Sequence, residues 1–167
     1  MKIILGSQSG ITIREAEVDE WDKVPALHRD EGEEYIKGSR QRNKMRFSKI
    51  PQGTHIVLFA ERQGRVVGAI QIELVHTNTK LADGKTIAHL NDLVVDPDVR
   101  GQGIGTRLMN LAEEMLQEKG FTKVTLGVWR NKKHAGLCAF YDKRGYQVWY
   151  EKKDGTATVF KKDLEQD

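Results

Sequence analysis

The sequence predicts an α/β protein of the α+β type, with a mixed, mainly antiparallel sheet of about seven strands and helices on both faces. Two observations lead to this prediction. Strand-like segments are joined by short polar turns within residues 55–74 and 146–161, as in antiparallel hairpins. Two strand–helix units occupy residues 87–119 and 124–144. A chain that combines hairpins with strand–helix units forms a mixed sheet covered by helices.

The N-terminal third of the chain is predicted to hold one strand and one or two helices. Residues 11–16 alternate between apolar and polar side chains, as a half-buried strand does. Asp19 suits the N-cap of a following helix. The buried stripe of that helix would contain Trp21, Val24, Leu27 and His28. Residues 31–49 are polar and basic, and they form either a second helix or an ordered loop.

The remainder of the chain shows clearer patterns. Apolar runs bounded by turn residues predict further strands at residues 55–61, 66–74, 87–95, 124–129, 146–151 and 156–161. Apolar side chains at helical spacing predict an amphipathic helix over residues 104–119, which Gly120 would cap. A shorter helix is predicted over residues 134–144. The chain length suits one domain, so we expect a single domain spanning residues 1–167.

The composition argues against several classes of protein. A formal net charge of +3 is far below that of a dedicated nucleic-acid binder. No apolar run approaches the ~20 residues of a membrane helix, and the N-terminal apolar patch is too short for a signal peptide. Cys138 is the only cysteine, which excludes an internal disulfide, and we interpret it as a structural residue. The five histidines lack metal-ligand spacing, so we predict no metal. We expect a cytoplasmic protein that binds neither membranes nor nucleic acid.

A glycine-rich turn follows the strand at residues 87–95. Gly101, Gly103 and Gly105 alternate where this strand gives way to a helix. Backbone amides that converge at a helix N-terminus favour an anion, and a phosphate or pyrophosphate is the expected guest. The alternative is a plain strand-to-helix turn. A dinucleotide fingerprint is excluded because position 106 is threonine, and the Gly-Lys-Ser/Thr ending of a P-loop is absent.

Two motifs together resemble those of the GNAT acetyltransferase superfamily. The run Arg100-x-x-Gly103-x-Gly105 looks like the family's acyl-CoA-binding motif, and residues 139–146 resemble its Phe-Tyr-x-x-x-Gly-Phe/Tyr box. One helix and one strand separate the two motifs, as the family requires. The order of predicted elements also agrees over residues 11–162, so the resemblance covers nearly the whole chain.

The resemblance implies how the cofactor binds. The fourth and fifth strands would splay apart, and acetyl-CoA, the co-substrate, would enter the gap. Its pyrophosphate would rest on the amides of residues 101–106, and its pantetheine arm would pair with the edge of residues 93–95. Either Asn131 or His134 would replace a family asparagine that touches pantetheine. The implied cofactor-binding residues on the strand and the turn are Leu93, Val94, Val95, Arg100, Gly101, Gln102, Gly103, Ile104, Gly105 and Thr106.

Acyl transfer to an amine needs a base for the amine, a donor for the oxyanion and a proton for the leaving thiolate. Tyr141 matches the family tyrosine that acts as general acid to the CoA sulfur. A backbone N–H near Leu93 is the implied oxyanion donor. His89, Asp92 and Glu73 are the candidate bases. Simple alternation places His89, Asn91, Leu93 and Val95 on one face of the strand. Alternation places Asp92 on the other face unless a bulge turns it inward.

The resemblance implies an N-acetyltransferase that acts directly on a primary amine of a small molecule or peptide. Glu73 and Trp129 are the residues we expect to bind that acceptor. The basic run at residues 40–46 and the acidic run at residues 30–34 are either solvated helix faces or selectors of acceptor charge. Family members often dimerise through their C-terminal strands. The competing readings are a non-catalytic acyl-CoA sensor of the same fold and a nucleic-acid-associated protein that uses residues 40–49.

Overall fold

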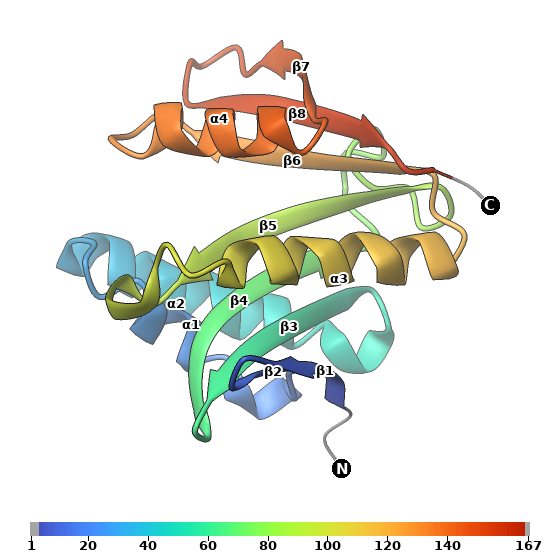
Figure 1. The fold of residues 1–167 in the computed structure, drawn as a ribbon. Helices are drawn as coiled ribbons and strands as arrows, with labels where there is room; N and C mark the ends of the chain where they lie inside the picture. Colours follow the sequence, from blue (N-terminus) through green and yellow to red (C-terminus); the bar gives the residue numbers. More distant parts are fainter. Residues whose placement is uncertain (1–3, 166–167) are drawn as a thin grey trace.

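The computed structural model describes residues 4–165, which form one eight-stranded sheet in the order β1-β2-β3-β4-β5-β6-β8-β7 (Figure 1). Within these residues β5 and β6 are parallel, and the other neighbouring pairs are antiparallel. Helices α3 and α4 cover one face of the sheet, and α1 and α2 cover the other. The predicted fold class, a mixed and mainly antiparallel sheet with helices, is confirmed. No helix of the described part is long and apolar enough to cross a membrane.

The sheet contains one strand that the sequence did not predict. The strands are β1 (Ile4–Gln8), β2 (Ile11–Glu15), β3 (His55–Arg62), β4 (Arg65–Glu73), β5 (Ile87–Val95), β6 (Lys123–Trp129), β7 (Gln147–Glu151) and β8 (Ala157–Asp163). The turn between β1 and β2 is Ser9-Gly10, and both residues have positive φ. Gln63-Gly64 joins β3 to β4 with the same backbone signs. Two-residue turns of this kind match the twist of a hairpin, so Ser9-Gly10 was a signal for β1.

The helices agree with the predictions except near residue 19. They are α1 (Lys23–Leu27), α2 (Glu33–Phe47), α3 (Ile104–Glu118) and α4 (His134–Lys143). Residues 31–49 therefore hold a helix rather than a loop. The prediction of Asp19 as N-cap is wrong, because residues 18–20 form a 3-10 turn and α1 starts after Asp22. Pro25 lacks an N–H and fits only the first turn of a helix, which excludes a helix that begins at Asp19.

Close packing fixes α3 against the sheet. The apolar stripe of α3 is buried in the larger core, and Ile104 and Leu108 face β4. A Cβ at Gly68 of β4 would approach the Ile104 Cγ2 atom to 3.1 Å and the Leu108 Cδ1 atom to 3.2 Å. This glycine therefore lets the N-terminal turn of α3 approach the sheet closely. A smaller core, which includes Val57, Phe59 and Ala69 from the strands, lies under α1 and α2.

The parallel pairing between β5 and β6 is short. It joins residues 87–90 to residues 123–126, and beyond them the two strands diverge toward the left of Figure 1. Strand β6 continues its pairing with β8 as far as Trp129. The C-terminal half of β5 therefore has no partner on the side of β6. This is the splay between the fourth and fifth strands that the sequence led us to expect.

Candidate active site

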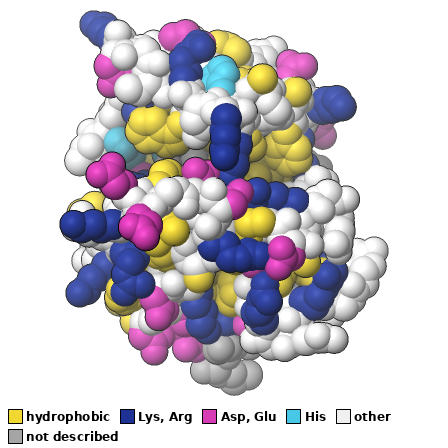
Figure 2. Space-filling model, turned by 90° about the vertical axis from the view of Figure 1, so that its left-hand side faces the viewer, with side chains coloured by type: hydrophobic (Ala, Val, Ile, Leu, Met, Phe, Trp, Pro, Cys, Tyr) yellow, Lys and Arg dark blue, Asp and Glu magenta, His cyan; other side chains and the backbone are white. Residues whose placement is uncertain are grey.

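A cleft of about 960 Å³ opens where β5 and β6 diverge. Figure 2 views the molecule from that side, where apolar side chains are exposed across the middle with Lys and Arg side chains close by. Side chains from α1 and α2 form part of its wall, and side chains from α4 form another part. The cleft is lined by most of the predicted cofactor-binding residues: Leu93, Val94, Val95, Arg100, Gly101, Gly103, Ile104, Gly105, Thr106 and Asn131.

The glycine-rich turn presents backbone amides to this cleft. Gly101 and Gly103 have φ values of +78° and +80°, a left-handed conformation that strains other residues. The first hydrogen bond of α3 runs from the Arg107 N–H to the Gly103 carbonyl (3.1 Å). The amides of residues 104–106 therefore have no acceptor inside the helix. With the helix dipole, these donors fit a pyrophosphate group.

Two predicted cofactor residues are engaged by other side chains. The Arg100 guanidinium donates to the Val95 carbonyl (2.9 Å) and to the Asp30 carboxylate (2.7 Å). Arg100 thus braces the turn against β5. The Gln102 side chain accepts a hydrogen bond from Arg62 (2.8 Å) and is not part of the cleft lining. Its backbone remains part of the turn.

A β-bulge in β5 changes which side chains face the cleft. The register with β4 shifts between Ala69 and Gln71, and Asp92 has a φ of +54°. The predicted shared face of His89, Asn91, Leu93 and Val95 is wrong, because Leu93 and Val95 pack against the larger core. Val94 instead packs in the smaller core under α1 and α2. Aspartate tolerates the left-handed conformation better than most residues, so Asp92 can form the bulge.

The bulge turns Asp92 into a buried polar network on the side of α1 and α2. The His28 Nε2–H donates to the Asp92 carboxylate (2.8 Å), and the Gln71 amide lies 3.4 Å from its second oxygen. Gln71 also donates to Asn43 of α2 and accepts from His55 of β3 (2.8 Å). One carboxylate therefore links the cleft to side chains from two strands and two helical segments.

Asp92 is ionised in this environment. Burial alone would raise the pKa of its carboxyl group. The hydrogen bond and charge of His28, with the charges of Arg46 and Arg42, outweigh burial and hold the pKa below its usual value. Among the described residues, the other ring nitrogen of His28, Nδ1, has no hydrogen-bond partner. His28 lines the cleft and contacts the Tyr35 ring, with the ring centroids 5.0 Å apart.

The other two candidate bases lie outside the cleft lining. His89 is 7% exposed, and its Nδ1 atom lies 2.7 Å from the Thr125 hydroxyl. Burial and the nearby charge of His76 lower the pKa of His89 to about 3, so the ring is neutral. The Glu73 carboxylate lies 4.0 Å from the Arg46 Nε atom and 3.9 Å from His76. Of the three, the structure brings only Asp92 into the cleft.

The remaining predicted residues lie near the end of β6. Asn131 lines the cleft, and its side chain accepts from the Lys133 N–H (2.9 Å). His134 is not part of the lining, and its Nε2 atom lies 3.0 Å from the Thr158 hydroxyl. Asn131 is therefore the better placed of the two alternatives for pantetheine. Trp129 lines the cleft with 60% of its surface exposed.

Tyr141 of α4 lines the cleft from the side opposite α2. Its ring packs edge-on against Phe140 and Tyr146. Burial raises the pKa of its phenol, the charge of Asp92 raises it further, and Arg144 opposes the shift. Within residues 4–165 its hydroxyl has no hydrogen-bond partner. The phenol is therefore protonated at neutral pH and available to a ligand.

The sequence analysis did not identify three residues of the cleft. His28 was assigned to a helix stripe, and its contact with Asp92 spans 64 residues, so no local signal could reveal it. Arg42 and Arg46 belong to the basic run of residues 40–46, and both line the cleft. Their spacing of four residues, which places two side chains on one helix face, was the available signal.

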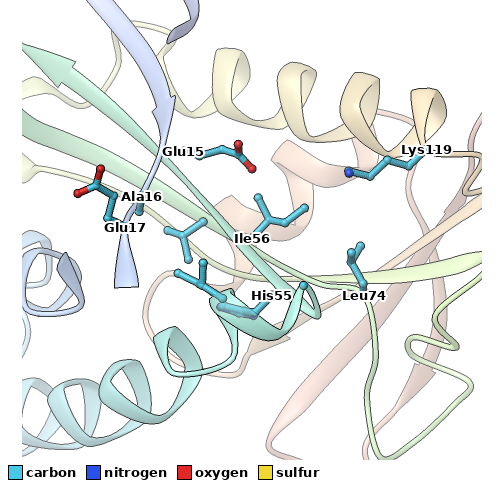
Figure 3. A pocket seen from close by; sticks show the side chains of 10 residues that line it. Glu15, Ala16, Glu17, His55, Ile56, Leu74 and Lys119 are labelled. Carbon is cyan, nitrogen blue, oxygen red and sulfur yellow. The ribbon is translucent and has the colours of Figure 1, made fainter. Parts of the chain in front are cut away.

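A second, smaller pocket of about 370 Å³ lies near the start of β3 (Figure 3). Ile56 and Leu74 line it, and Glu15 of β2 and Lys119 at the end of α3 point toward it. None of the predicted site residues contributes to this pocket, and it has no glycine-rich turn. The cleft between β5 and β6 is therefore the candidate active site.

Comparisons with known families and curated proteins agree with this geometry. Residues 16–146 match the model of the acetyltransferase (GNAT) family. An uncharacterized N-acetyltransferase of Bacillus subtilis, YhfO, is 27% identical over 82% of this chain and 90% of that protein. Aminoalkylphosphonate N-acetyltransferase of Salmonella typhimurium is 34% identical over 53% of this chain. Glucosamine 6-phosphate N-acetyltransferase of Trypanosoma brucei brucei is 33% identical over 51% of this chain. Apart from YhfO, the curated relatives are matched over 27% to 54% of their own lengths.

Solved structures share the fold. A crystal structure of the PaiA N-acetyltransferase of Thermoplasma acidophilum, in complex with coenzyme A, superposes with a TM-score of 0.72. The two chains are 21% identical, and the match covers 92% of this chain and 98% of that one. The order of strands and the splay between β5 and β6 are therefore features of a known fold.

Proposed function

The chain belongs to the acetyltransferase (GNAT) family of acetyl-CoA-dependent N-acetyltransferases, and we propose that it transfers acetyl directly to a primary amine of a small molecule. One observation carries this proposal. The amides at the N-terminus of α3, the free edge of β5 and the hydroxyl of Tyr141 face the same cleft. Two curated relatives are named for small amines that carry a phosphate or a phosphonate, which favours a small molecule over a peptide.

Acetyl-CoA supplies an activated thioester to this cleft. In our proposal its pyrophosphate accepts hydrogen bonds from the amides of residues 101–106, where the dipole of α3 adds to the attraction. Its pantetheine arm lies along residues 93–95, whose edge has no partner strand, and Asn131 contacts it. A backbone N–H near Leu93 would then donate to the oxyanion that develops on the thioester carbonyl.

His28 and Asp92 are proposed to remove the proton from the amine. Because the ionised Asp92 accepts from Nε2–H, a neutral His28 carries its free lone pair on Nδ1. The amine proton moves to that nitrogen as the C–N bond forms, and the negative charge of Asp92 stabilises the imidazolium that results. His28 thus acts as the base and Asp92 orients it. His89, which is buried and bonded to Thr125, is not retained as a base.

Tyr141 is proposed to act on the leaving group. When the C–S bond breaks, its electron pair remains on sulfur, and the Tyr141 phenol donates its proton or a hydrogen bond to that thiolate. The raised pKa of this phenol keeps the proton in place until the sulfur needs it. Solvent then restores the proton that the phenol has lost.

The test is release of free CoA thiol with acetyl-CoA and a panel of amines. We expect release only when an amine is present, and a Tyr141→Phe variant should lower kcat on the order of 10²-fold. Its affinity for CoA should remain that of the wild type. Tyr150→Phe is the matched control, because Tyr150 lies on β7 and is not part of the cleft lining. Tight CoA binding without turnover of any amine would instead support the alternative, a non-catalytic acyl-CoA sensor.

A further inference from the structure

We propose that the acceptor amine carries a phosphorus oxyanion, and that Arg42 and Arg46 of α2 bind this group. The inference rests on the proposed function, since it names the class of acceptor that the same cleft takes. Arg42 and Arg46 lie four residues apart, on one face of α2, and both line the cleft.

The two guanidinium groups are not neutralised within the described part of the chain. Arg42 forms no ion pair there and lies over the Tyr35 ring, 5.3 Å from its centroid. The nearest carboxylate oxygen to Arg46 belongs to Glu73 and is 4.0 Å away. In contrast, the carboxylates that line this part of the cleft are paired, Glu31 with Lys133 (2.8 Å) and Asp92 with His28. The acceptor side therefore has two positive charges in excess.

Buried contacts hold both arginines toward the cleft. Asn43 lies between them in sequence and is completely buried, where it donates to the Ser39 carbonyl and accepts from Gln71 of β4. These contacts fix the rotation of α2. A Cβ at Gly38 would approach the Arg42 Nη1 atom to 2.9 Å, so the absence of a side chain there leaves room for the guanidinium. Fixed guanidinium groups lose less entropy when they bind an anion.

The position of the two arginines separates them from the phosphates of the cofactor. The charges of both groups act on Asp92, and that of Arg46 also acts on His89 near the start of β5. The amides that suit the pyrophosphate lie after the opposite end of β5, at residues 101–106. An anion on Arg42 and Arg46 would therefore belong to the acceptor, with its amine near His28 and Asp92.

The charge pattern also selects among amines. Two adjacent guanidinium groups match a dianionic phosphate or phosphonate better than a single carboxylate, because each can donate two hydrogen bonds to the same group. A polycationic amine would meet two like charges at close range, which opposes its binding. A neutral amino alcohol would leave both cations without a partner.

The experiment compares 2-aminoethyl phosphate, 2-aminoethylphosphonate and 2-aminoethanol as acceptors. We expect kcat/KM for the two anionic amines to exceed that for 2-aminoethanol by roughly 10²-fold or more, since each hydrogen bond between charged groups contributes roughly 1.5–3 kcal/mol. Their ratio shows whether the ester oxygen of phosphate matters. Arg42→Met and Arg46→Met should each raise KM for the anionic amines roughly 10-fold or more and leave that of 2-aminoethanol unchanged. Arg40→Met is the control, because Arg40 lies over Trp21 and is not part of the cleft lining.

Binding of 2-aminoethyl phosphate to the CoA-saturated protein, measured by calorimetry, tests the site without turnover. We expect binding by the wild type and by Arg40→Met, and loss of binding in the Arg42→Met and Arg46→Met variants with unchanged CoA affinity. Equal use of 2-aminoethanol, or equal effects of the variants on charged and neutral amines, would overturn the inference. Failure of the proposed function would look different: binding would persist, but no amine would release CoA thiol.

Discussion

Gly103 and Gly120 offer a matched pair of positions at the two ends of α3. Their φ values are +80° and +89°, and an added Cβ would meet no atom within 4 Å at either position. Alanine at either site therefore introduces the same backbone strain without a clash. Only Gly103 lines the cleft. The pair separates the strain of a left-handed alanine from the loss of a ligand-binding surface.

The expected magnitudes follow from this geometry. A left-handed alanine costs about 1–2 kcal/mol, and 1 kcal/mol lowers the Tm of a protein of this size by roughly 2–4 °C. Both variants should therefore unfold about 2–8 °C below the wild type. At Gly103 the new methyl group also occupies space beside the amides of residues 104–106. Loss of one hydrogen bond to a charged phosphate costs roughly 1.5–3 kcal/mol, which weakens CoA binding roughly 10- to 100-fold.

Calorimetric titration with CoA and thermal unfolding followed by circular dichroism measure the two effects separately. We expect Gly103→Ala to lose affinity for CoA and Gly120→Ala to retain it, with similar falls in Tm. Wild-type affinity in Gly103→Ala would refute the assignment of the glycine-rich turn. Equal losses of affinity in both variants would show that destabilisation, rather than the cleft, controls binding.

Three further predictions concern the base, the buried histidines and the position of α3. Asp92→Asn should lower kcat on the order of 10²-fold, because the amide cannot stabilise a protonated His28, while the KM for acetyl-CoA stays the same; an unchanged kcat would exclude the pair as the base. Burial, the largest cause for each ring, lowers the pKa of His55 to about 4 and of His89 to about 3, so each folded ring stays neutral where the unfolded one binds a proton. Denaturant titrations should therefore show each histidine contributing a loss of about 2 kcal/mol between pH 6.5 and 5, and the loss should shrink in a His55→Gln variant. Gly68→Ala should destabilise the protein by roughly 1–3 kcal/mol because its methyl group would press on α3, and a wild-type Tm would contradict this close contact.

Local patterns in the sequence determined most of the strands, the helix α3 and the glycine-rich turn. Hairpins and amphipathic helices depend on contacts between residues close together in the chain, and their apolar spacing records those contacts. The same is true of Gly101 and Gly103, whose positive φ values only glycine adopts without strain. Strand β1 was missed because its residues are mostly polar and partly exposed, although Ser9-Gly10 is a turn of the hairpin type.

The choice of side chains that face the cleft depended on tertiary structure. Alternation along β5 failed at Asp92, because a bulge is a property of two paired strands and leaves little trace in one of them. The contact between His28 and Asp92 joins residues from different elements, so neither neighbourhood in the sequence could predict it. The sequence by itself determined that an anion site precedes α3. Only the folded chain decided that a paired base and two unneutralised arginines face it, because burial and charge pairing arise between distant segments.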